Sequence, residues 1–229
     1  MPLPMVHISV AEILLSAGFA VQNVPQFYLG IISPDAIHMR AGVDVAAKHG
    51  THLIAADKKW SDINENEYVN FMLGFINENR GKTDPSFLWG YGIHILTDMY
   101  WVKRVHMKFR EDYAADPAPI QEEREAYYND TDILDHALFR ESGGETEAWR
   151  ALQGAAAQDF LHLLSAAEIH AWHERTLHWF DTGESRHKNP VRYIQKATVT
   201  NFIRECAEII LGRVPTTDNA RILRQFFAN

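Results

Sequence analysis

Residues 87–102 read FLWGYGIHILTDMYWV, and this stretch decides the fold class. It follows Asp84 and Pro85, which match the N-cap and the first position of a helix. The stretch is apolar on almost every side, which is typical of a helix buried inside a domain rather than lying on its surface. We predict a long central helix that begins at Pro85 and ends near Tyr113.

Helix signals recur on both sides of this segment. A capping box, a Ser followed three residues later by a Glu, stands at Ser9 and again at Ser165. Apolar residues with a helical period, Phe71 among them, run from 65 to 79. The predicted flanking helices cover 9–18, 65–79, 165–183 and 190–212, with a short last helix from Thr217 or Asp218. Alternating strand patterns of useful length are absent, so we predict one all-α domain over residues 1–229 with about seven to nine helices.

The composition is that of an ordinary globular protein, with 46% hydrophobic and 23% charged residues. The chain carries 22 Lys and Arg against 30 Asp and Glu, a formal net charge of −8. This balance argues against a protein that binds nucleic acid through a broad basic face. It does not exclude phosphate-containing substrates, because a bound metal ion reverses the local sign of the field.

The expected compartment is the cytoplasm. The single cysteine, Cys206, cannot form an internal disulfide. The first residues lack the basic leader of a secretory signal, and no window reaches ~18 uninterrupted apolar residues. We therefore expect no integral membrane contact, while amphipathic faces near the C-terminus would permit a homodimer.

His94 and Asp98 are the first candidates for chemistry. At positions i and i+4 they share one face of the central helix. A carboxylate inside so apolar a helix is costly unless it is paired or bound to a metal. Two interpretations stay open at this point: a buried His–Asp hydrogen bond that braces the core, or part of a metal site.

Three further residues favour the metal site. His7 is expected just before the first helix, Asp35 in a Ser-Pro-Asp turn after an apolar run, and His52 close to a loop-to-helix junction. Together with the pair in the central helix they suggest a His/Asp metal centre. Imidazole and carboxylate ligands suit Zn, Mn, Fe or Ni better than Ca or Mg. An aspartate that bridges two ions would make a site for displacement at phosphorus.

The series also resembles the bacterial zinc-dependent phospholipase C family, and more closely its uncharacterised cytoplasmic branch. The matching motifs are His7, LGIISPD at 29–35, THL at 51–53 and GYGIHILTDMYW at 90–101. The resemblance implies an all-α fold of the phospholipase C/nuclease type, with a zinc cluster that hydrolyses phosphodiester or phosphomonoester bonds. By matching position, the implied ligands are His7, Asp35, His52, His94 and Asp98, with Asp98 as the preferred bridge.

The chain departs from the family pattern in two ways. Secreted members bind metal through a processed N-terminal tryptophan, whereas this chain begins Met-Pro-Leu. The family also carries an HxxxE motif soon after HxxxD, whereas the only HxxxE here, His170 to Glu174, comes more than 70 residues later. We therefore expect a one- or two-metal site, with zinc as the first choice. The helical spacing of His170 and Glu174 leaves chelation by this pair open.

Four further candidates are Arg40, a proposed catalytic residue, and the weaker candidates His38, Asp130 and Asp132. Asp130 and Asp132 precede a helical pattern, where they would cap a helix, complete the site or orient a ligand imidazole. His38 and Arg40 follow Asp35 and are candidates for gripping a substrate phosphate, with an ordinary surface role as the alternative for Arg40.

The expected function is metal-dependent hydrolysis of a small phosphoester. The metal-site motifs lie within residues 1–101, and further helices are expected over 120–229. Asp35 is the favoured general base, and Arg40 or His38 would neutralise the phosphoryl oxygens. One alternative is a metal-binding protein without hydrolytic activity. Another is a helical interaction module in which His94 and Asp98 form only a hydrogen-bonded pair. A phosphohydrolase of the HD type is disfavoured, because no His is followed directly by Asp.

Overall fold

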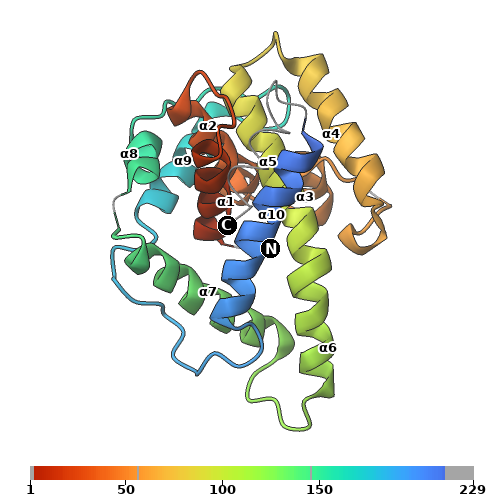
Figure 1. Ribbon diagram of the computed structural model, residues 1–229, viewed down its shortest axis with the longest axis vertical. Coiled ribbons are helices and arrows are strands. Elements are labelled where there is room, and N and C mark those ends of the chain that lie inside the picture. Colours follow the sequence, from red (N-terminus) through yellow and green to blue (C-terminus); the bar gives the residue numbers. More distant parts are fainter. Residues whose placement is uncertain (1–2, 56, 145, 215–229) are drawn as a thin grey trace.

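A computed structural model describes residues 3–55, 57–144 and 146–214, and these are built from helices (Figure 1). The α-helices are α1 (Pro4–Ser16), α2 (Val24–Ile32), α3 (Val45–Thr51), α4 (Glu65–Asn79), α5 (Pro85–Trp101), α6 (Met107–Ala115), α7 (Glu123–Glu141), α8 (Glu147–Gln153), α9 (Ala166–Leu177) and α10 (Lys196–Arg213). Two 3-10 helices, η1 (Ser33–Met39) and η2 (Trp60–Asp62), and a π-helical turn, η3 (Val102–His106), complete the set. The described residues include no strand, and they form nine α-helices when α5, η3 and α6 are counted as one. The all-α prediction is confirmed.

The central helix is the one that the sequence predicts. The Asp84 side chain accepts hydrogen bonds from the backbone N–H groups of Ser86 and Phe87, at 2.7 and 3.2 Å, and Pro85 occupies the first turn. Within α5 every residue from 86 to 101 except Trp89 is buried. Helices α1, α2, α4 and α10 all contact α5, which lies in the middle of the molecule in Figure 1. None of the helices in the described residues is both long and apolar enough to cross a bilayer.

Helix α2 crosses α5 at two glycines, where the two backbones touch. A Cβ atom on Gly90 would lie 2.1 Å from the Phe27 carbonyl oxygen, and one on Gly30 would lie 2.2 Å from the Phe87 carbonyl oxygen. Only glycine allows so close an approach, because any side chain would separate the helices. The crossing holds the end of α2, and η1 after it, against the middle of α5.

The first helix begins earlier than predicted. It opens at Pro4, so the expected start at the Ser9 capping box is wrong, and the Leu3 N-cap makes no side-chain hydrogen bond. The cap comes instead from α7, where Asp135 Oδ1 accepts a hydrogen bond from the Met5 N–H at 3.0 Å. Proline is tolerated in the first turn because its missing N–H is one that no helical carbonyl would accept. His7, expected just before the helix, therefore lies inside it.

Two later helices are shorter than predicted. The Ser165 capping box opens α9 as expected, but the helix ends at Leu177 rather than near Gly183. Helix α10 begins at Lys196 rather than at Pro190. The segment between them, residues 178–195, is held by side chains of α7 instead of continuing either helix.

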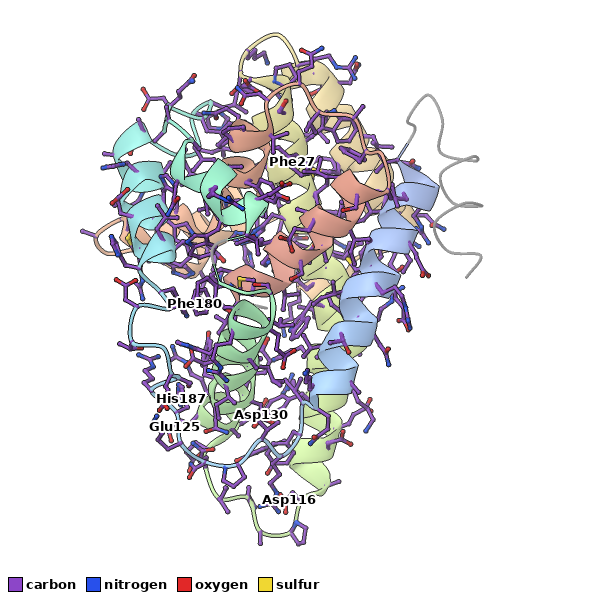
Figure 2. All side chains as sticks on the ribbon, turned by 60° about the vertical axis from the view of Figure 1, so that its left-hand side comes forward. Phe27, Asp116, Glu125, Asp130, Phe180 and His187 are labelled. Carbon is purple, nitrogen blue, oxygen red and sulfur yellow. The ribbon has the colours of Figure 1, made fainter. Side chains whose placement is uncertain are left out.

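Buried carboxylates inside α7 anchor this segment. Asp130 accepts hydrogen bonds from the backbone N–H groups of Arg192, Tyr193 and Ile194, at 2.7 to 3.2 Å. Figure 2 shows Asp130 on α7 beside the segment. Both Asp130 and Asp132 lie in the middle of α7, so the expectation that either caps the start of a helix is wrong.

Two further expectations concern single elements. The helix over 65–79 has the predicted bounds, but Phe71 is 50% exposed because it lies beside the buried stripe of Tyr68, Met72 and Ile76 rather than in it. The short last helix predicted from Thr217 or Asp218 lies outside the described residues.

Candidate metal centre

The structure brings the five predicted ligands together from four elements. They are His7 of α1, Asp35 of η1, His52 at the C-cap of α3, and His94 and Asp98 of α5. The three imidazoles and Asp98 are at most 2% exposed, while the side chain of Asp35 is 15% exposed.

The distances between these groups are those of atoms around a common centre. Asp98 Oδ1 lies 3.5 Å from His7 Nε2, and Asp98 Oδ2 lies 3.3 Å from His52 Nε2 and 3.5 Å from His94 Nε2. Asp35 Oδ1 lies 3.5 Å from His52 Nε2. Charge-assisted hydrogen bonds are shorter, about 2.7–2.9 Å. Ligand atoms at about 2.1 Å from a tetrahedral zinc ion are about 3.4 Å apart, and the four distances above are close to this spacing.

The outer nitrogens of two imidazoles are fixed by backbone carbonyls. His94 Nδ1 lies 2.7 Å from the Ile31 carbonyl oxygen, and His52 Nδ1 lies 3.0 Å from the Lys48 carbonyl oxygen. Because a carbonyl only accepts, each Nδ1 carries a proton, and Nε2 is the atom that each imidazole turns towards the centre. Tyr68 holds the end of α3 in place, since its hydroxyl donates to the His52 carbonyl oxygen at 2.8 Å.

The inward-facing atoms are buried without a hydrogen-bond partner among the described residues. They are Nε2 of His7, Oδ1 of Asp35, Nε2 of His52, Nε2 of His94 and both carboxylate oxygens of Asp98, while the second ring nitrogen of His7 is buried without a partner as well. A buried polar atom without a partner costs about 1–3 kcal/mol, so this many in one place require a shared partner. A transition-metal cation satisfies nitrogen lone pairs and carboxylates together, and the residues present therefore fit such an ion.

The ligands form two overlapping sets. One set is His7, His94 and Asp98, the other is Asp35, His52 and His94, and within each set the ligand atoms lie within 4.8 Å of one another. Asp98 turns one oxygen to His7 and the other to His52 and His94. His94 is common to both sets, and the residues present could hold one or two ions.

The charges of the centre suit metal binding. Burial and the neighbouring His94 lower the pKa of His7 to about 3, so this imidazole stays neutral. Burial raises the pKa of both carboxyl groups, but the imidazoles of His52 and His94 outweigh it and hold the pKa of Asp35 and that of Asp98 below their ordinary values. Burial lowers the pKa of His52, yet Asp35 and Asp98 outweigh it and raise this pKa to about 9. A metal ion bound here would displace the His52 proton.

Three positioning residues were missed in the sequence. Asp135 caps α1 and so sets the position of His7, one turn further along. Gly30 and Gly90 allow the helix crossing that places the Ile31 carbonyl on His94. Asp135 follows Asp130 and Asp132 closely in the sequence, but nothing in that stretch indicates that it caps a helix 130 residues away.

His38 and Arg40, which were expected to bind a substrate phosphate, have different surroundings. Arg40 is bound by Glu168 of α9, with Nε 2.6 Å from Oε1 and Nη2 3.1 Å from Oε2, and it also donates to the Leu163 carbonyl oxygen. His38 lies at the edge of the centre, with Nε2 3.6 Å from Asp35 Oδ1.

The remaining candidates lie apart from the five ligands. Asp130 accepts hydrogen bonds from backbone N–H groups of the 178–195 segment, and Asp132 accepts a hydrogen bond from the Ser185 hydroxyl. His170 and Glu174 are exposed on α9 and form a separate group with His173, whose Nε2 lies 2.8 Å from the Leu152 carbonyl oxygen.

A cavity of about 330 Å³ opens beside the centre. Asp35, His38 and Lys48 line it from η1 and α3, and Asp132 lines it from α7. Asp35 is thus the ligand that belongs both to the buried cluster and to the cavity wall.

Comparisons of this chain with protein-family models, with curated proteins and with solved structures found no match, so a function has to be argued from the geometry of the centre and its cavity.

Proposed function

We propose that this protein is a metal-dependent hydrolase of phosphoester bonds that acts on a small substrate. The observation that carries the proposal is the set of buried, unpartnered ligand atoms that face one centre beside an open cavity. His7, Asp35, His52, His94 and Asp98 would hold one or two ions, zinc first and Mn, Fe or Ni as alternatives. The resemblance of the motifs to zinc-dependent phospholipase C supports the same reaction class.

A bound transition-metal ion supplies Lewis acidity and a water of lowered pKa. The chain's own residues would do the rest. Asp35 reaches the cavity, so its carboxylate can accept the proton of the attacking water. Lys48 and His38 line the same wall and would stabilise the negative phosphoryl oxygens. This role passes to Lys48 because the guanidinium of Arg40 is bound by Glu168.

One observation favours a second candidate, a metal-binding protein without hydrolytic activity. Four of the five ligand side chains are at most 2% exposed, and structural zinc sites are closed in this way. The two candidates differ in whether a substrate can reach the ion past Asp35.

Metal content and turnover measured together test both candidates. Wild type, His94→Ala and His178→Ala are purified without a His-tag or chelator. His178→Ala is the control, because the imidazole of His178 is 68% exposed and belongs to neither ligand set. Elemental mass spectrometry should find about one to two equivalents of metal in wild type and His178→Ala, and a loss in His94→Ala. Bis(p-nitrophenyl) phosphate and p-nitrophenyl phosphate are then offered with Zn or Mn.

The outcomes distinguish the hydrolase from the non-catalytic metal-binding protein. Turnover that is lost on chelation and in His94→Ala supports the hydrolase. Metal without turnover of either ester supports the closed, non-catalytic site. Wild type that takes up no metal even after reconstitution overturns both.

A further inference from the structure

The cavity beside the metal centre is lined by cations that the proposed chemistry does not use. Besides Lys48, it carries Arg175 of α9 and Arg186 of the 178–195 segment. Among the described residues, none of these three cations forms an ion pair with a carboxylate. Arg40, in contrast, forms an ion pair with Glu168. The chain as a whole has a net charge of −8, so this local excess of positive charge runs against its average.

The acidic groups of the cavity do not balance these cations. Asp35 belongs to the ligand set, where its charge faces the imidazoles. Asp132 accepts a hydrogen bond from the Ser185 hydroxyl, which ties the 178–195 segment to α7 next to Arg186. The three cations therefore outnumber the two carboxylates of the cavity wall, and Arg175 and Arg186 are left to face an anion.

The two arginines are held at the cavity by different means. The Arg175 guanidinium lies 5.5 Å from the ring centre of Trp172 and 5.4 Å from that of Trp179, so two indoles limit its freedom. Arg186 follows Ser185, whose hydroxyl is bound to Asp132. Figure 2 shows the neighbouring His187, which also lines the cavity, on this segment beside α7. Lys48, in contrast, comes from α3, next to the metal ligands.

We infer that this cavity selects phosphoesters that carry a second anionic group, a carboxylate or a phosphate, and rejects cationic head groups. The inference rests on the proposed function for the place of the scissile phosphate, beside Asp35 and Lys48. The second anionic group then lies against Arg175 and Arg186, because guanidinium groups bind carboxylate and phosphate oxygens in a fork. A cationic group at that end meets two guanidinium groups, neither of which forms an ion pair with a described carboxylate.

Three phosphonates of the same length but different tail charge test the inference. They are 3-phosphonopropionate, propylphosphonate and 3-aminopropylphosphonate, whose C–P bonds are not hydrolysed. Isothermal titration calorimetry on the zinc-loaded protein should show that 3-phosphonopropionate binds about tenfold more tightly than propylphosphonate, and that the amine binds most weakly. Arg186→Gln should remove most of the preference for the anionic tail and leave propylphosphonate binding unchanged.

Arg204→Gln is the matched control, because Arg204 is exposed on α10 and does not line the cavity. Equal affinities for the three phosphonates, tightest binding of the amine, or a preference that survives Arg186→Gln would overturn the inference.

The same titration on metal-free protein distinguishes this result from failure of the proposed function. If no ester is hydrolysed but the Arg186-dependent preference for the anionic tail persists, the anion site stands and the hydrolase falls. If esters are hydrolysed with no charge preference, the hydrolase stands and the inference is refuted.

Discussion

Replacing Gly90 by alanine tests whether the contact between α2 and α5 supports both the fold and the metal centre. In an exposed helix the change would raise the free energy of unfolding by about 1 kcal/mol. Here the new Cβ would lie 2.1 Å from the Phe27 carbonyl oxygen and 2.9 Å from the Ile31 nitrogen, which are backbone atoms and cannot rotate away. Overpacking of this kind costs about 1–3 kcal/mol.

The loss should extend to the metal ligands. Moving the helices apart lengthens the 2.7 Å hydrogen bond from His94 Nδ1 to the Ile31 carbonyl oxygen, which is worth about 1 kcal/mol. The gain in helix propensity and the lost hydrogen bond roughly cancel, so the net expectation for Gly90→Ala is a free energy of unfolding lower by about 1–3 kcal/mol. Zinc affinity should fall about tenfold or more, because the carbonyl that orients His94 has moved.

Urea unfolding followed by circular dichroism, with chelator present, measures the first effect. Gly74→Ala is the matched control, since Gly74 lies inside α4 and its Cβ would meet nothing within 4 Å. The control should unfold at a higher urea concentration, by about 0.5–1 kcal/mol in free energy, with an unchanged slope m.

The sign of the change in the free energy of unfolding tests the close contact between α2 and α5. If Gly90→Ala is stabilised as Gly74→Ala is, the two backbones do not touch as described. If stability falls but zinc affinity equals that of wild type, the Ile31 carbonyl does not orient His94.

Three further predictions follow from buried groups. Zinc at about 100 times its dissociation constant should raise the free energy of unfolding by about 2.7 kcal/mol in wild type and leave Asp98→Ala unchanged in calorimetry, and a shift that persists in the variant contradicts the ligand set. Burial raises the pKa of Asp135 well above its ordinary 3.8, so the stability that this carboxyl contributes is present below about pH 4 and is lost as pH rises through the raised pKa. Asp135→Asn should therefore gain stability relative to wild type between about pH 4 and pH 7, and parallel urea midpoints would speak against it. Burial also raises the pKa of Cys206 to about 12, so its thiol should react with an aromatic disulfide reagent at neutral pH only after unfolding, and rapid reaction of the native protein would refute this.

The central helix was predictable because its signals are local. The Asp84 cap and Pro85 act within the first turn, and the apolar residues on all its faces leave burial as the only stable arrangement. The Ser165 capping box is local in the same way, and the structure contains both of its hydrogen bonds.

The start of α1 shows where local signals fail. The Ser9 pattern is a valid cap in isolation, but Asp135, 130 residues away, offers the Met5 N–H a buried acceptor. The earlier start depends on the packing of α7 against α1, which no short window of sequence contains. The same holds for the 178–195 segment, which follows the carboxylates of α7 instead of its own helical pattern.

By itself, the sequence determined the all-α class and the central helix, and it indicated the five candidate ligands. The positions of His94 and Asp98 relative to each other follow from helical spacing alone. Only the tertiary structure decided that His7, Asp35 and His52 face them, and that Arg40 is bound by Glu168. The physical reason is range: capping and periodicity act within about four residues, whereas the centre forms only where helix packing brings separate elements into contact.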